Sequence, residues 1–455
     1  MIPLSLKEVA ANLGATLIGD DCIFTSVTTD SRKVEAGSLF VALRGDKFDG
    51  HQFCADVCHQ GAKALLVSEV QAVDVPQLVV EDTRYALGRL GALVRSRAKA
   101  KIVAITGSCG KTTVKEMCAS ILGQCGSVLA TQGNLNNEIG VPLTLLRLTP
   151  DYDYAVLELG ANHPGEIAWT TSLVKPDVAI INNVAAAHLE GFGSLQGVAL
   201  AKSEIFNGLD ERGIAIVNAD SEFFSYWQSN LGASMVSFGL ENSAADFVAR
   251  DLRCDADALF HFTLVTPQGE IDVSLPLPGR HNIANALAAA ALIQSLGINL
   301  SIIKQGLESM SPVKGRLCVS RLPCGLTLID DTYNASVQSV LAAIDTLATM
   351  PGFRVMVFGD MGELGVEAVE LHRQVGEHAR ACNLDLFMAV GPLSIHAAQA
   401  AGGRHFADKG SLFAALEELL SRSRHSDITL LAKGARSSHM EEVIEFVKTR
   451  KEQTC

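Results

Sequence analysis

The sequence lacks a long apolar run, an excess of positive charge and paired cysteine motifs. Because no uncharged stretch approaches membrane-spanning length and the N-terminus has no basic region followed by an apolar core, we expect neither a membrane span nor an export signal. The formal net charge of −13 argues against nonspecific binding to nucleic acid or to an anionic membrane surface. Anionic ligands would therefore have to bind in small pockets of local positive charge.

The 11 cysteines are scattered along the chain and do not have the paired spacing of zinc sites. With 455 residues, of which 48% are hydrophobic, the chain can form several apolar cores and does not need a disulfide framework. We therefore expect reduced thiols and a cytoplasmic protein of roughly three domains. Internal repeats and low-complexity tracts are also absent from the sequence.

The most informative feature is a phosphate-binding pattern in residues 102–116. An apolar strand runs into a glycine turn and then into a helix with apolar residues at helical spacing, so the positive helix N-terminus would face a bound anion. Glycines let backbone N–H groups approach a triphosphate, Lys111 supplies a positive charge, and Thr112 could coordinate Mg²⁺. The candidate nucleotide-binding residues are Gly107, Ser108, Cys109, Gly110, Lys111, Thr112 and Thr113.

Two features of this loop leave alternatives open. The general nucleotide-binding pattern has a further glycine five residues before Gly110, where this chain has Ile105, so a tight turn formed by chance is the competing interpretation. Cys109 would lie at a helix N-terminus, where the helix dipole could favour a reactive thiolate. The alternative is that Cys109 is only a small neutral residue tolerated in the turn.

The order of elements predicts an α/β protein with three domains. Residues 1–100 indicate a small α/β domain, joined by a polar, basic linker at 95–101 to a P-loop domain at 101–314. That central domain would hold a parallel sheet with helices, and 234–277 would add antiparallel strands around a turn at 267–269. Residues 315–455 predict a Rossmann-like domain that begins with a hairpin turning at 323–325. Strands are expected at 39–43, 64–67, 77–80, 155–159, 178–182, 214–218, 326–329, 354–358, 386–390 and 428–431, and helices at 6–13, 82–95 and 282–296.

Further candidates follow the central strands, because ligands of parallel α/β sheets bind at the carboxyl ends of strands. Glu158 ends an apolar strand and could bind Mg²⁺ or could simply face solvent. His188 could bind a metal, although a lone histidine is more often structural. Lys202 begins a helical pattern, where a surface lysine is the default interpretation. The loop at 131–140 could bind a polar ligand or could be a turn only. Its amides are Asn134, Asn136 and Asn137.

Taken together, these residues resemble the Mur ligase family of ATP-dependent amide-forming enzymes, which extend the peptidoglycan precursor. The similarity spans nearly the whole chain. The family's loop, Gly-x-x-Gly-Lys-(Thr/Ser)-Thr after a threonine, accounts for Ile105. The resemblance implies ATP and Mg²⁺ as cofactors and a carbamate on Lys202, which turns a cation into an anion near the metals. The residues that would contact Mg²⁺ are Thr112, Glu158 and His188.

The resemblance also assigns nucleotide-binding roles later in the chain. The segment 279–285 is similar to the family segment that contacts adenine, with Asn282 as the residue implied. Arg316 would reach a phosphate from the third domain, and Asp331 would hold the ribose. Val337 stands where a proline is usual in the family, which could alter this loop slightly. The residue that would bracket adenine is Tyr333 or Asn334.

Segments 158–166, 358–372 and 433–437 resemble the family members that join D-alanyl-D-alanine to a UDP-linked muramoyl tripeptide. The Asp-Asn-Pro-Arg string of the members that add the third residue does not occur in the sequence. Segments 29–32 and 39–51 resemble the uridine-nucleotide domain, which folylpolyglutamate synthases lack. The substrate-binding residues implied are Ser31, Arg32, Arg44, Lys433 and Arg436, together with the loop amides.

The implied partners are therefore these two small-molecule substrates, for a monomeric enzyme of peptidoglycan synthesis and hence of cell shape and division. Two alternatives stay open at this point. Another ligase of the same family could add a different amino acid, which the accepted UDP-muramoyl substrate would reveal. A regulatory P-loop ATPase could hydrolyse ATP with no ligation, in which case phosphate release would ignore added amines and carboxylates.

Overall fold

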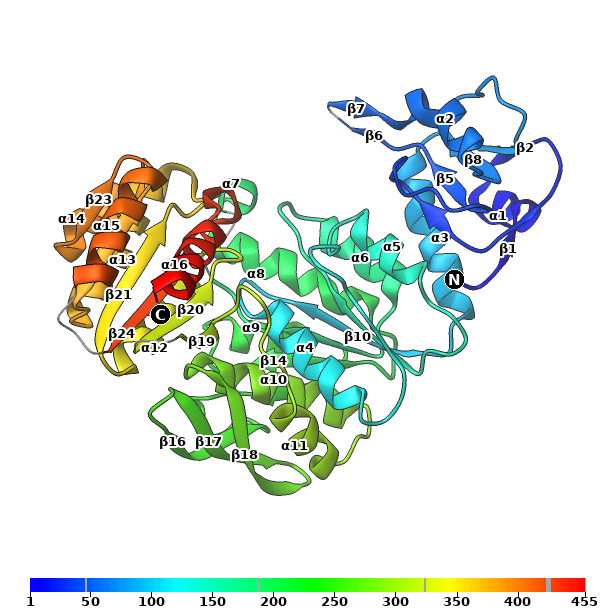
Figure 1. Ribbon diagram of the computed structural model, residues 1–455. Helices are drawn as coiled ribbons and strands as arrows, with labels where there is room; N and C mark the ends of the chain where they lie inside the picture. Colours follow the sequence, from blue (N-terminus) through cyan, green and yellow to red (C-terminus); the bar gives the residue numbers. More distant parts are fainter. Residues whose placement is uncertain (46, 186–188, 323–324, 423–426, 455) are drawn as a thin grey trace.

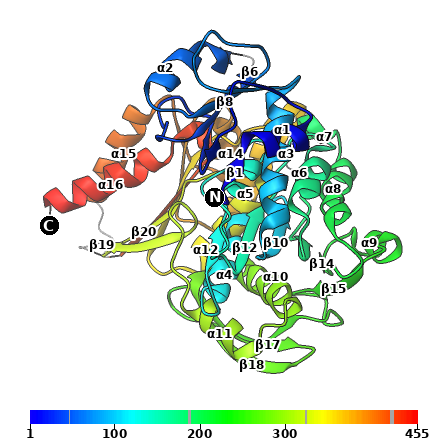
Figure 2. The ribbon, with the colours of Figure 1, turned by 90° about the vertical axis from the view of Figure 1, so that its right-hand side faces the viewer.

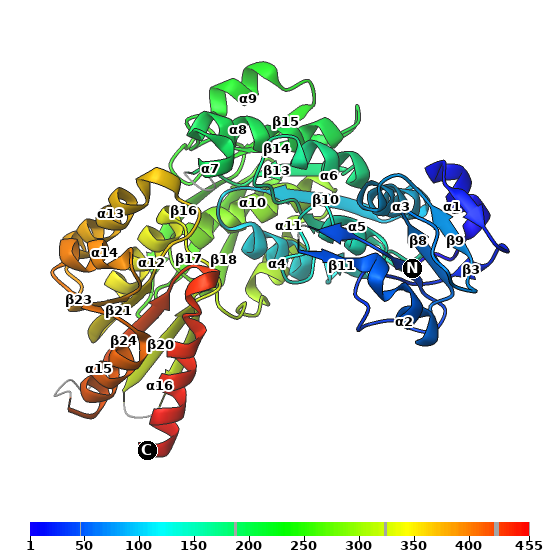
Figure 3. The ribbon, with the colours of Figure 1, turned by 90° about the horizontal axis from the view of Figure 1, so that it is seen from above.

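The computed structural model describes residues 1–45, 47–185, 189–322, 325–422 and 427–454. The chain forms three α/β lobes, and Figure 1 shows the N-terminal and C-terminal lobes on either side of the central one. The view from above gives the same arrangement (Figure 3). Among the described residues, no helix has the length and apolar character needed to cross a membrane.

The N-terminal lobe is built on a five-stranded sheet of order β2-β9-β8-β5-β4. Asp82 caps α3, and α3 packs against α5 and α6 of the central lobe. The sheet strands are β2 (Thr16–Ile18), β4 (Val27–Thr28), β5 (Leu39–Val41), β8 (Ala64–Val67) and β9 (Gln77–Val79). Two short pairs are β1 (Leu4–Ser5) with β3 (Ile23–Phe24), and β6 (Arg44–Gly45) with β7 (Phe48–Asp49). The helices are α1 (Leu6–Leu13), α2 (Cys54–His59) and α3 (Thr83–Arg97).

The central lobe contains a six-stranded parallel sheet of order β11-β12-β10-β13-β14-β15, which places the strand of the phosphate loop in its interior. The strands are β10 (Lys101–Thr106), β11 (Val128–Ala130), β12 (Tyr154–Glu158), β13 (Val178–Ile181), β14 (Ile214–Asn218) and β15 (Ser234–Phe238). The helices are α4 (Lys111–Leu122), α5 (Gly140–Leu145), α6 (Glu166–Val174), α7 (Leu189–Phe192), α8 (Leu195–Ser203), α9 (Phe224–Asn230), α10 (His281–Ser295) and α11 (Leu300–Glu308).

A small antiparallel sheet lies beyond α10 and α11 at the far end of this lobe, as the side view shows (Figure 2). The alanine-rich helix α10 is buried against α4 and the central sheet, because its small side chains allow close packing. The strands of the small sheet are β16 (Val248–Cys254), β17 (Leu259–Thr266) and β18 (Gly269–Pro278).

The C-terminal lobe has a six-stranded sheet of order β19-β20-β24-β21-β22-β23, parallel except for β19. This is the doubly wound arrangement expected from the sequence. Its strands are β19 (Cys318–Leu322), β20 (Leu326–Asp331), β21 (Phe353–Gly359), β22 (Leu386–Val390), β23 (Arg404–Phe406) and β24 (Ile428–Lys433). The helices are α12 (Val337–Thr349), α13 (Ala368–Ala381), α14 (Ser394–Ala401), α15 (Lys409–Arg422) and α16 (Glu441–Thr454).

Two local expectations are wrong. The expected linker at 95–101 is largely structured, because α3 continues to Arg97 and Arg95 donates to the carbonyl oxygens of Val174 and Lys175 at 2.9 and 3.0 Å. The first strand of the expected antiparallel group, Ser234–Phe238, instead pairs in parallel with β14. Of the expected hairpin, β19 and β20 pair antiparallel as predicted, while residues 323–324 at its tip lie outside the described residues.

Candidate active site

The glycine loop follows β10 at the carboxyl end of the central sheet and leads into α4. Gly110 has a φ of 78°, a left-handed conformation that disfavours side chains. A Cβ at this position would lie 2.5 Å from Asn285 Oδ1, so the close packing also requires glycine. The helix that follows buries Val114, Met117 and Ile121, as the sequence predicted.

Two asparagine side chains that follow the neighbouring strand β13 hold this loop in place. The backbone N–H of Cys109 donates to Asn183 Oδ1 at 2.8 Å, and the carbonyl oxygen of Cys109 accepts from the side chains of Asn182 and Asn183 at 3.0 Å each. Asn182 Nδ2 also donates to Asn285 Oδ1, and Asn285 Nδ2 donates to Asn282 Oδ1. The predicted adenine contact Asn282 is thus connected to the phosphate loop by a chain of buried amides.

Lys111 is folded back onto the loop, with Nζ donating to the carbonyl oxygen of Gly107 at 2.6 Å. Burial lowers the pKa of Lys111, and the nearby Glu158 carboxylate opposes that shift. A polyanion bound at the loop would favour the charged form of this amine and would compete for its hydrogen bonds.

Glu158 and Thr112 place two oxygen-bearing side chains next to each other beside the loop. Glu158 is only 1% exposed, which excludes the alternative that it faces solvent. Its Oε2 accepts from Thr112 Oγ1 at 3.4 Å, and among the residues that the structure describes its buried Oε1 has no hydrogen-bond partner. A carboxylate and a hydroxyl are hard oxygen donors, so these residues fit Mg²⁺.

A buried lysine on the same helix, Lys115, supports Glu158. Lys115 Nζ lies 3.7 Å from Glu158 Oε1 and donates to the carbonyl oxygen of Thr131 at 2.8 Å. The hydroxyl of Thr131 in turn accepts from the backbone N–H of Glu158 at 3.0 Å. The sequence analysis missed Lys115, although its position four residues after Lys111 places both lysines on one face of α4.

Lys202 does not lie on a helix surface. It occupies the end of α8 rather than the start of a helix, and it is 3% exposed. Burial, with a contribution from the positive charge of Lys111, lowers the pKa of Lys202 to about 7. A large share of this amine is therefore neutral, and nucleophilic, near neutral pH. The other predicted metal ligand of this region, His188, lies outside the described residues.

The C-terminal lobe reaches the phosphate loop directly. Arg316 Nη2 donates to Thr112 Oγ1 at 3.0 Å, and its guanidinium group lies 4.3 Å from the centre of the Tyr333 ring. Cys109 Sγ and Ser336 Oγ form a second contact between the lobes, at 3.0 Å. The predicted phosphate contact Arg316 is therefore placed at the predicted phosphate loop.

The ribose candidate Asp331 is buried beside Lys433. Lys433 Nζ lies 2.6 Å from Asp331 Oδ2 and also donates to the carbonyl oxygen of Asn334. Burial raises the pKa of Asp331, while the positive charge of Lys433 acts in the opposite direction. The backbone N–H of Arg436 lies 3.4 Å from Asn334 Oδ1, so the segment after β24 contacts the segment after β20.

A cavity of about 900 Å³ lies between the phosphate loop and the C-terminal lobe. The phosphate loop and the start of α10 form one side, and the C-terminal lobe forms the other. Predicted residues that line it are Ser108, Cys109, Gly110, Thr113, Asn282, Arg316, Asp331, Asn334, Lys433 and Arg436.

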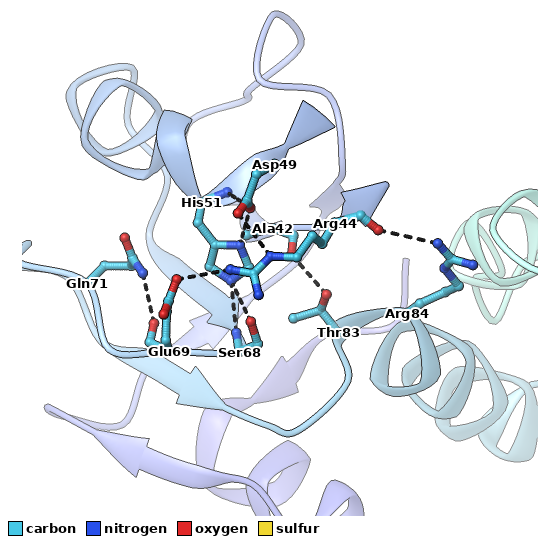
Figure 4. A network of polar contacts seen from close by, with 9 residues as sticks. All are labelled: Ala42, Arg44, Asp49, His51, Ser68, Glu69, Gln71, Thr83 and Arg84. Carbon is cyan, nitrogen blue, oxygen red and sulfur yellow. Dashed lines mark hydrogen bonds and ion pairs between the residues drawn. The ribbon is translucent and has the colours of Figure 1, made fainter. Parts of the chain in front are cut away.

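The N-terminal candidates are not among the residues that line this cavity. Arg44 pairs with Asp49 and Glu69 at 2.9 and 3.0 Å, and its carbonyl oxygen accepts from Arg84 (Figure 4). Arg84 also pairs with Glu138 at 2.8 Å and so connects the β6–β7 hairpin to the amide-rich loop of the central lobe.

The buried side chain of His51 belongs to the same polar network. Its Nδ1 lies 2.6 Å from Asp49 Oδ1, and its Nε2 accepts from the backbone N–H of Ser68 (Figure 4). Hydrogen bonds from His51 and Arg44 lower the pKa of Asp49 to about 2. Ser31 and Arg32 lie in a separate turn, where Arg32 is 85% exposed and pairs with Asp30.

The three loop amides differ in their roles. Asn137 Oδ1 accepts from the backbone N–H groups of Ile139 and Gly140, so its side chain stabilises the turn before α5. The backbone carbonyl oxygen of Asn136 accepts from the backbone N–H of Gly160, two residues after Glu158. The backbone N–H of Asn136 in turn donates to the carbonyl oxygen of Asn134.

The parallel sheet, the glycine loop after its interior strand and the lysine at the start of the following helix define a P-loop nucleotide-binding protein with two further α/β domains. Comparisons with known proteins narrow this class. Models of the Mur ligase middle domain, the glutamate ligase domain and the Mur ligase family catalytic domain match residues 105–293, 315–436 and 23–95. The chain belongs to the Mur ligase family.

Individual relatives agree with this placement over nearly the full chain. The UDP-N-acetylmuramoyl-tripeptide--D-alanyl-D-alanine ligase of Escherichia coli K12 is 54% identical over 98% of this chain and 98% of its own. A crystal structure of MurF from Acinetobacter baumannii, 37% identical, superposes with a TM-score of 0.93 and covers 97% of this chain and 98% of that one. The Thermotoga maritima MurF ligase in complex with ADP is 28% identical and superposes with a TM-score of 0.85. The match covers 94% of this chain and 98% of that one.

Proposed function

We propose that this protein joins D-alanyl-D-alanine to UDP-N-acetylmuramoyl-tripeptide at the expense of ATP, giving the UDP-muramoyl-pentapeptide precursor of peptidoglycan. The observation that carries the proposal is the cavity in which the phosphate loop faces Arg316, Asp331 and Lys433 of the C-terminal lobe. A triphosphate in this cavity would be held between groups from both lobes. The choice of substrates is supported by the relative that is 54% identical over nearly the whole chain.

The chemistry needs activation because a carboxylate is resonance-stabilised and its oxygen is a poor leaving group. The terminal carboxylate of the tripeptide attacks the γ-phosphorus of ATP, which releases ADP and leaves an acyl phosphate. The amine of D-alanyl-D-alanine then attacks the acyl carbon, the C–O bond to phosphate breaks, and the nitrogen loses a proton. Lys111 and Arg316 reduce the repulsion between carboxylate and triphosphate in the first step.

We also propose Mg²⁺ as a cofactor, held by Thr112 and Glu158. Their oxygen chemistry supports this assignment, as does Glu158 Oε1, which has no hydrogen-bond partner among the described residues. When bound, Mg²⁺ neutralises charge on the transferring phosphate. His188 and a carbamate on Lys202 are proposed as further ligands, and the pKa of about 7 supports the second, since only the neutral amine can add to CO₂.

The remaining assignments extend this proposal to the whole chain. We assign residues 1–100 to the UDP-substrate domain, 101–314 to the ATP-binding domain and 315–455 to the domain that closes over ATP. Arg44, Ser31 and Arg32 would bind the uridine nucleotide, while Lys433 and Arg436 would contact substrate from the third domain. The enzyme would act as a cytoplasmic monomer in the wall synthesis that supports cell shape and division.

The test is phosphate release from ATP by the purified protein in the presence of Mg²⁺. Both UDP-muramoyl tripeptide and D-alanyl-D-alanine are supplied together, and each is omitted in turn. We expect release only when both are present, with a pentapeptide product of the corresponding mass. Release that ignores both substrates would indicate an ATPase without ligase activity, and a requirement for a different acceptor would indicate another ligase of the family.

A further inference from the structure

A cluster of three potential metal ligands lies between helices α12 and α13 of the C-terminal lobe. Asp345 projects from α12, and His378 and Cys382 lie four residues apart at the end of α13. None of the three lines the nucleotide cavity. We propose that Asp345, His378 and Cys382 form a binding site for a transition-metal ion of the Zn²⁺ type.

Two of the three distances within the cluster match those of a metal site. Cys382 Sγ lies 3.6 Å from both His378 Nε2 and Asp345 Oδ1. Tetrahedral Zn²⁺, with bonds of about 2.0 to 2.3 Å, separates a sulfur ligand from a nitrogen or oxygen ligand by about 3.6 Å. The two sulfur distances therefore already match the tetrahedron.

The third distance requires a small adjustment. His378 Nε2 and Asp345 Oδ1 lie 2.6 Å apart, as in a hydrogen bond, whereas two ligands of one Zn²⁺ would lie about 3.3 Å apart. The carboxylate can move this far by side-chain rotation because Asp345 is 61% exposed. The two helices pack against each other, so the backbone positions of the ligands are set without the ion.

The charges of the cluster also suit a divalent ion. A thiolate and a carboxylate together carry two negative charges, and the neutral imidazole completes a donor set that favours Zn²⁺ or Co²⁺ over Mg²⁺ or Ca²⁺. Burial and the adjacent Asp345 raise the pKa of the Cys382 thiol, and a bound cation would reverse that shift. The partial exposure of all three groups leaves a fourth position for water.

Cobalt provides a direct test because its thiolate complexes absorb light in the near ultraviolet. Co²⁺ is titrated into the full chain, free of any affinity tag and in excess Mg²⁺, which occupies oxygen-ligand sites. We expect a thiolate-to-cobalt charge-transfer band that saturates at one ion per chain and disappears when Zn²⁺ is added. Cys382→Ser should abolish the band, whereas Cys254→Ser, at an exposed cysteine on β16, should leave it unchanged.

Two further variants separate metal binding from a structural effect of the cysteine. Asp345→Asn keeps the side-chain shape and His378→Gln keeps a polar side chain of similar length, and each should weaken Co²⁺ binding by at least about tenfold. A wild-type protein without the band, a band that persists in Cys382→Ser, or unchanged affinity in both of these variants would each overturn the proposal. In that case the cluster is only a hydrogen-bonded Asp–His pair beside a thiol.

Discussion

At the scale of single residues, the side chain of Lys111 gives the most direct test of the phosphate loop. We expect Lys111→Ala to lose at least about a hundredfold in turnover, since removing one charge contact to the reacting phosphate costs about 3 kcal/mol of transition-state stabilisation. The fold should be retained, because among the described residues the amine donates a hydrogen bond to the Gly107 carbonyl oxygen of the loop and to no other group. Phosphate release and circular dichroism measure the two effects.

The matched control is Lys101→Ala, which removes an exposed lysine at the start of β10, the strand that leads into the loop. This variant should keep normal turnover. Wild-type activity in Lys111→Ala would contradict the phosphate-loop assignment, and equal losses in both variants would indicate a general loss of structure.

A second prediction at the scale of single residues concerns Lys202. If it acts as a carbamate, Lys202→Ala should be nearly inactive and should regain part of its activity when small carboxylic acids are added, because they can replace the missing carboxylate. The pKa of about 7 also predicts that activation by CO₂ falls as the pH drops below 7, where the amine becomes protonated. Activity assays with and without acetate measure the rescue. Normal turnover with alanine or arginine at this position would contradict the carbamate.

The sequence predicted the loop residues and missed those that support them for a physical reason. The glycines, Lys111 and Thr112 are neighbours in the chain, so their pattern is visible locally. Lys115 and Asn285 matter only because distant segments meet them in space, at Glu158 and Asn182. The burial of Lys202 depends in the same way on tertiary packing, so the helical pattern alone suggested a surface position.

At the scale of elements, a buried histidine joins α13 to the loop after β21. His372 Nε2 accepts from the backbone N–H of Met361 at 3.0 Å, and its Nδ1 lies 2.6 Å from the carbonyl oxygen of Ala368. Only neutral imidazole can accept at Nε2, and burial lowers the pKa of His372 below the ordinary 6.5.

This contact predicts how stability depends on pH. Between the lowered folded-state pKa and about 6.5 the unfolded chain binds more protons at this position, so the free energy of unfolding should fall as the pH drops below 6.5. The glutamine in His372→Gln can still accept from Met361 but does not titrate. The free energy of unfolding of this variant should therefore fall less on acidification than that of the wild type. Urea denaturation at pH 7.5 and 5.5 measures both proteins. An equal loss of stability on acidification would contradict this role.

Most elements could be predicted because hydrophobic periodicity is a local signal. The helix Leu6–Leu13 and the strand Ala64–Val67 appear with the predicted bounds. The strand Ser234–Phe238 was assigned to the wrong sheet, because pairing direction depends on which strand lies beside it and not on its own residues. The helix α3 extends past Arg95 because that side chain finds carbonyl partners 79 and 80 residues further along the chain.

At the scale of the whole molecule, the two outer lobes are attached to the central one in different ways. The N-terminal lobe shares a continuous apolar core with the central sheet, and α3 packs directly on α5 and α6. Among the described residues, the C-terminal lobe contacts the phosphate loop through two hydrogen bonds across the cavity, one from Arg316 to Thr112 and one between Cys109 and Ser336. We therefore expect the C-terminal lobe to move when ATP binds, with residues 314–315 as the hinge.

Gly315 provides the test of that hinge. Its φ of 75° is left-handed, and a Cβ there would lie 3.2 Å from Tyr333 Cβ, so Gly315→Ala restricts rotation at the joint. X-ray scattering should show a smaller radius of gyration when an ATP analogue and both substrates are added to the wild type. In Gly315→Ala this change should be reduced and turnover should be slower.

Gly297→Ala is the matched control, because Gly297, between α10 and α11, has a φ of 88° but open space around it. Both variants should lose roughly 1 kcal/mol of stability from the left-handed alanine, and Gly315→Ala should lose more because of the close contact with Tyr333. Only the hinge variant should lose closure. Compaction that is absent from the wild type would contradict the movement itself, and equal compaction in both variants would place the moving joint elsewhere.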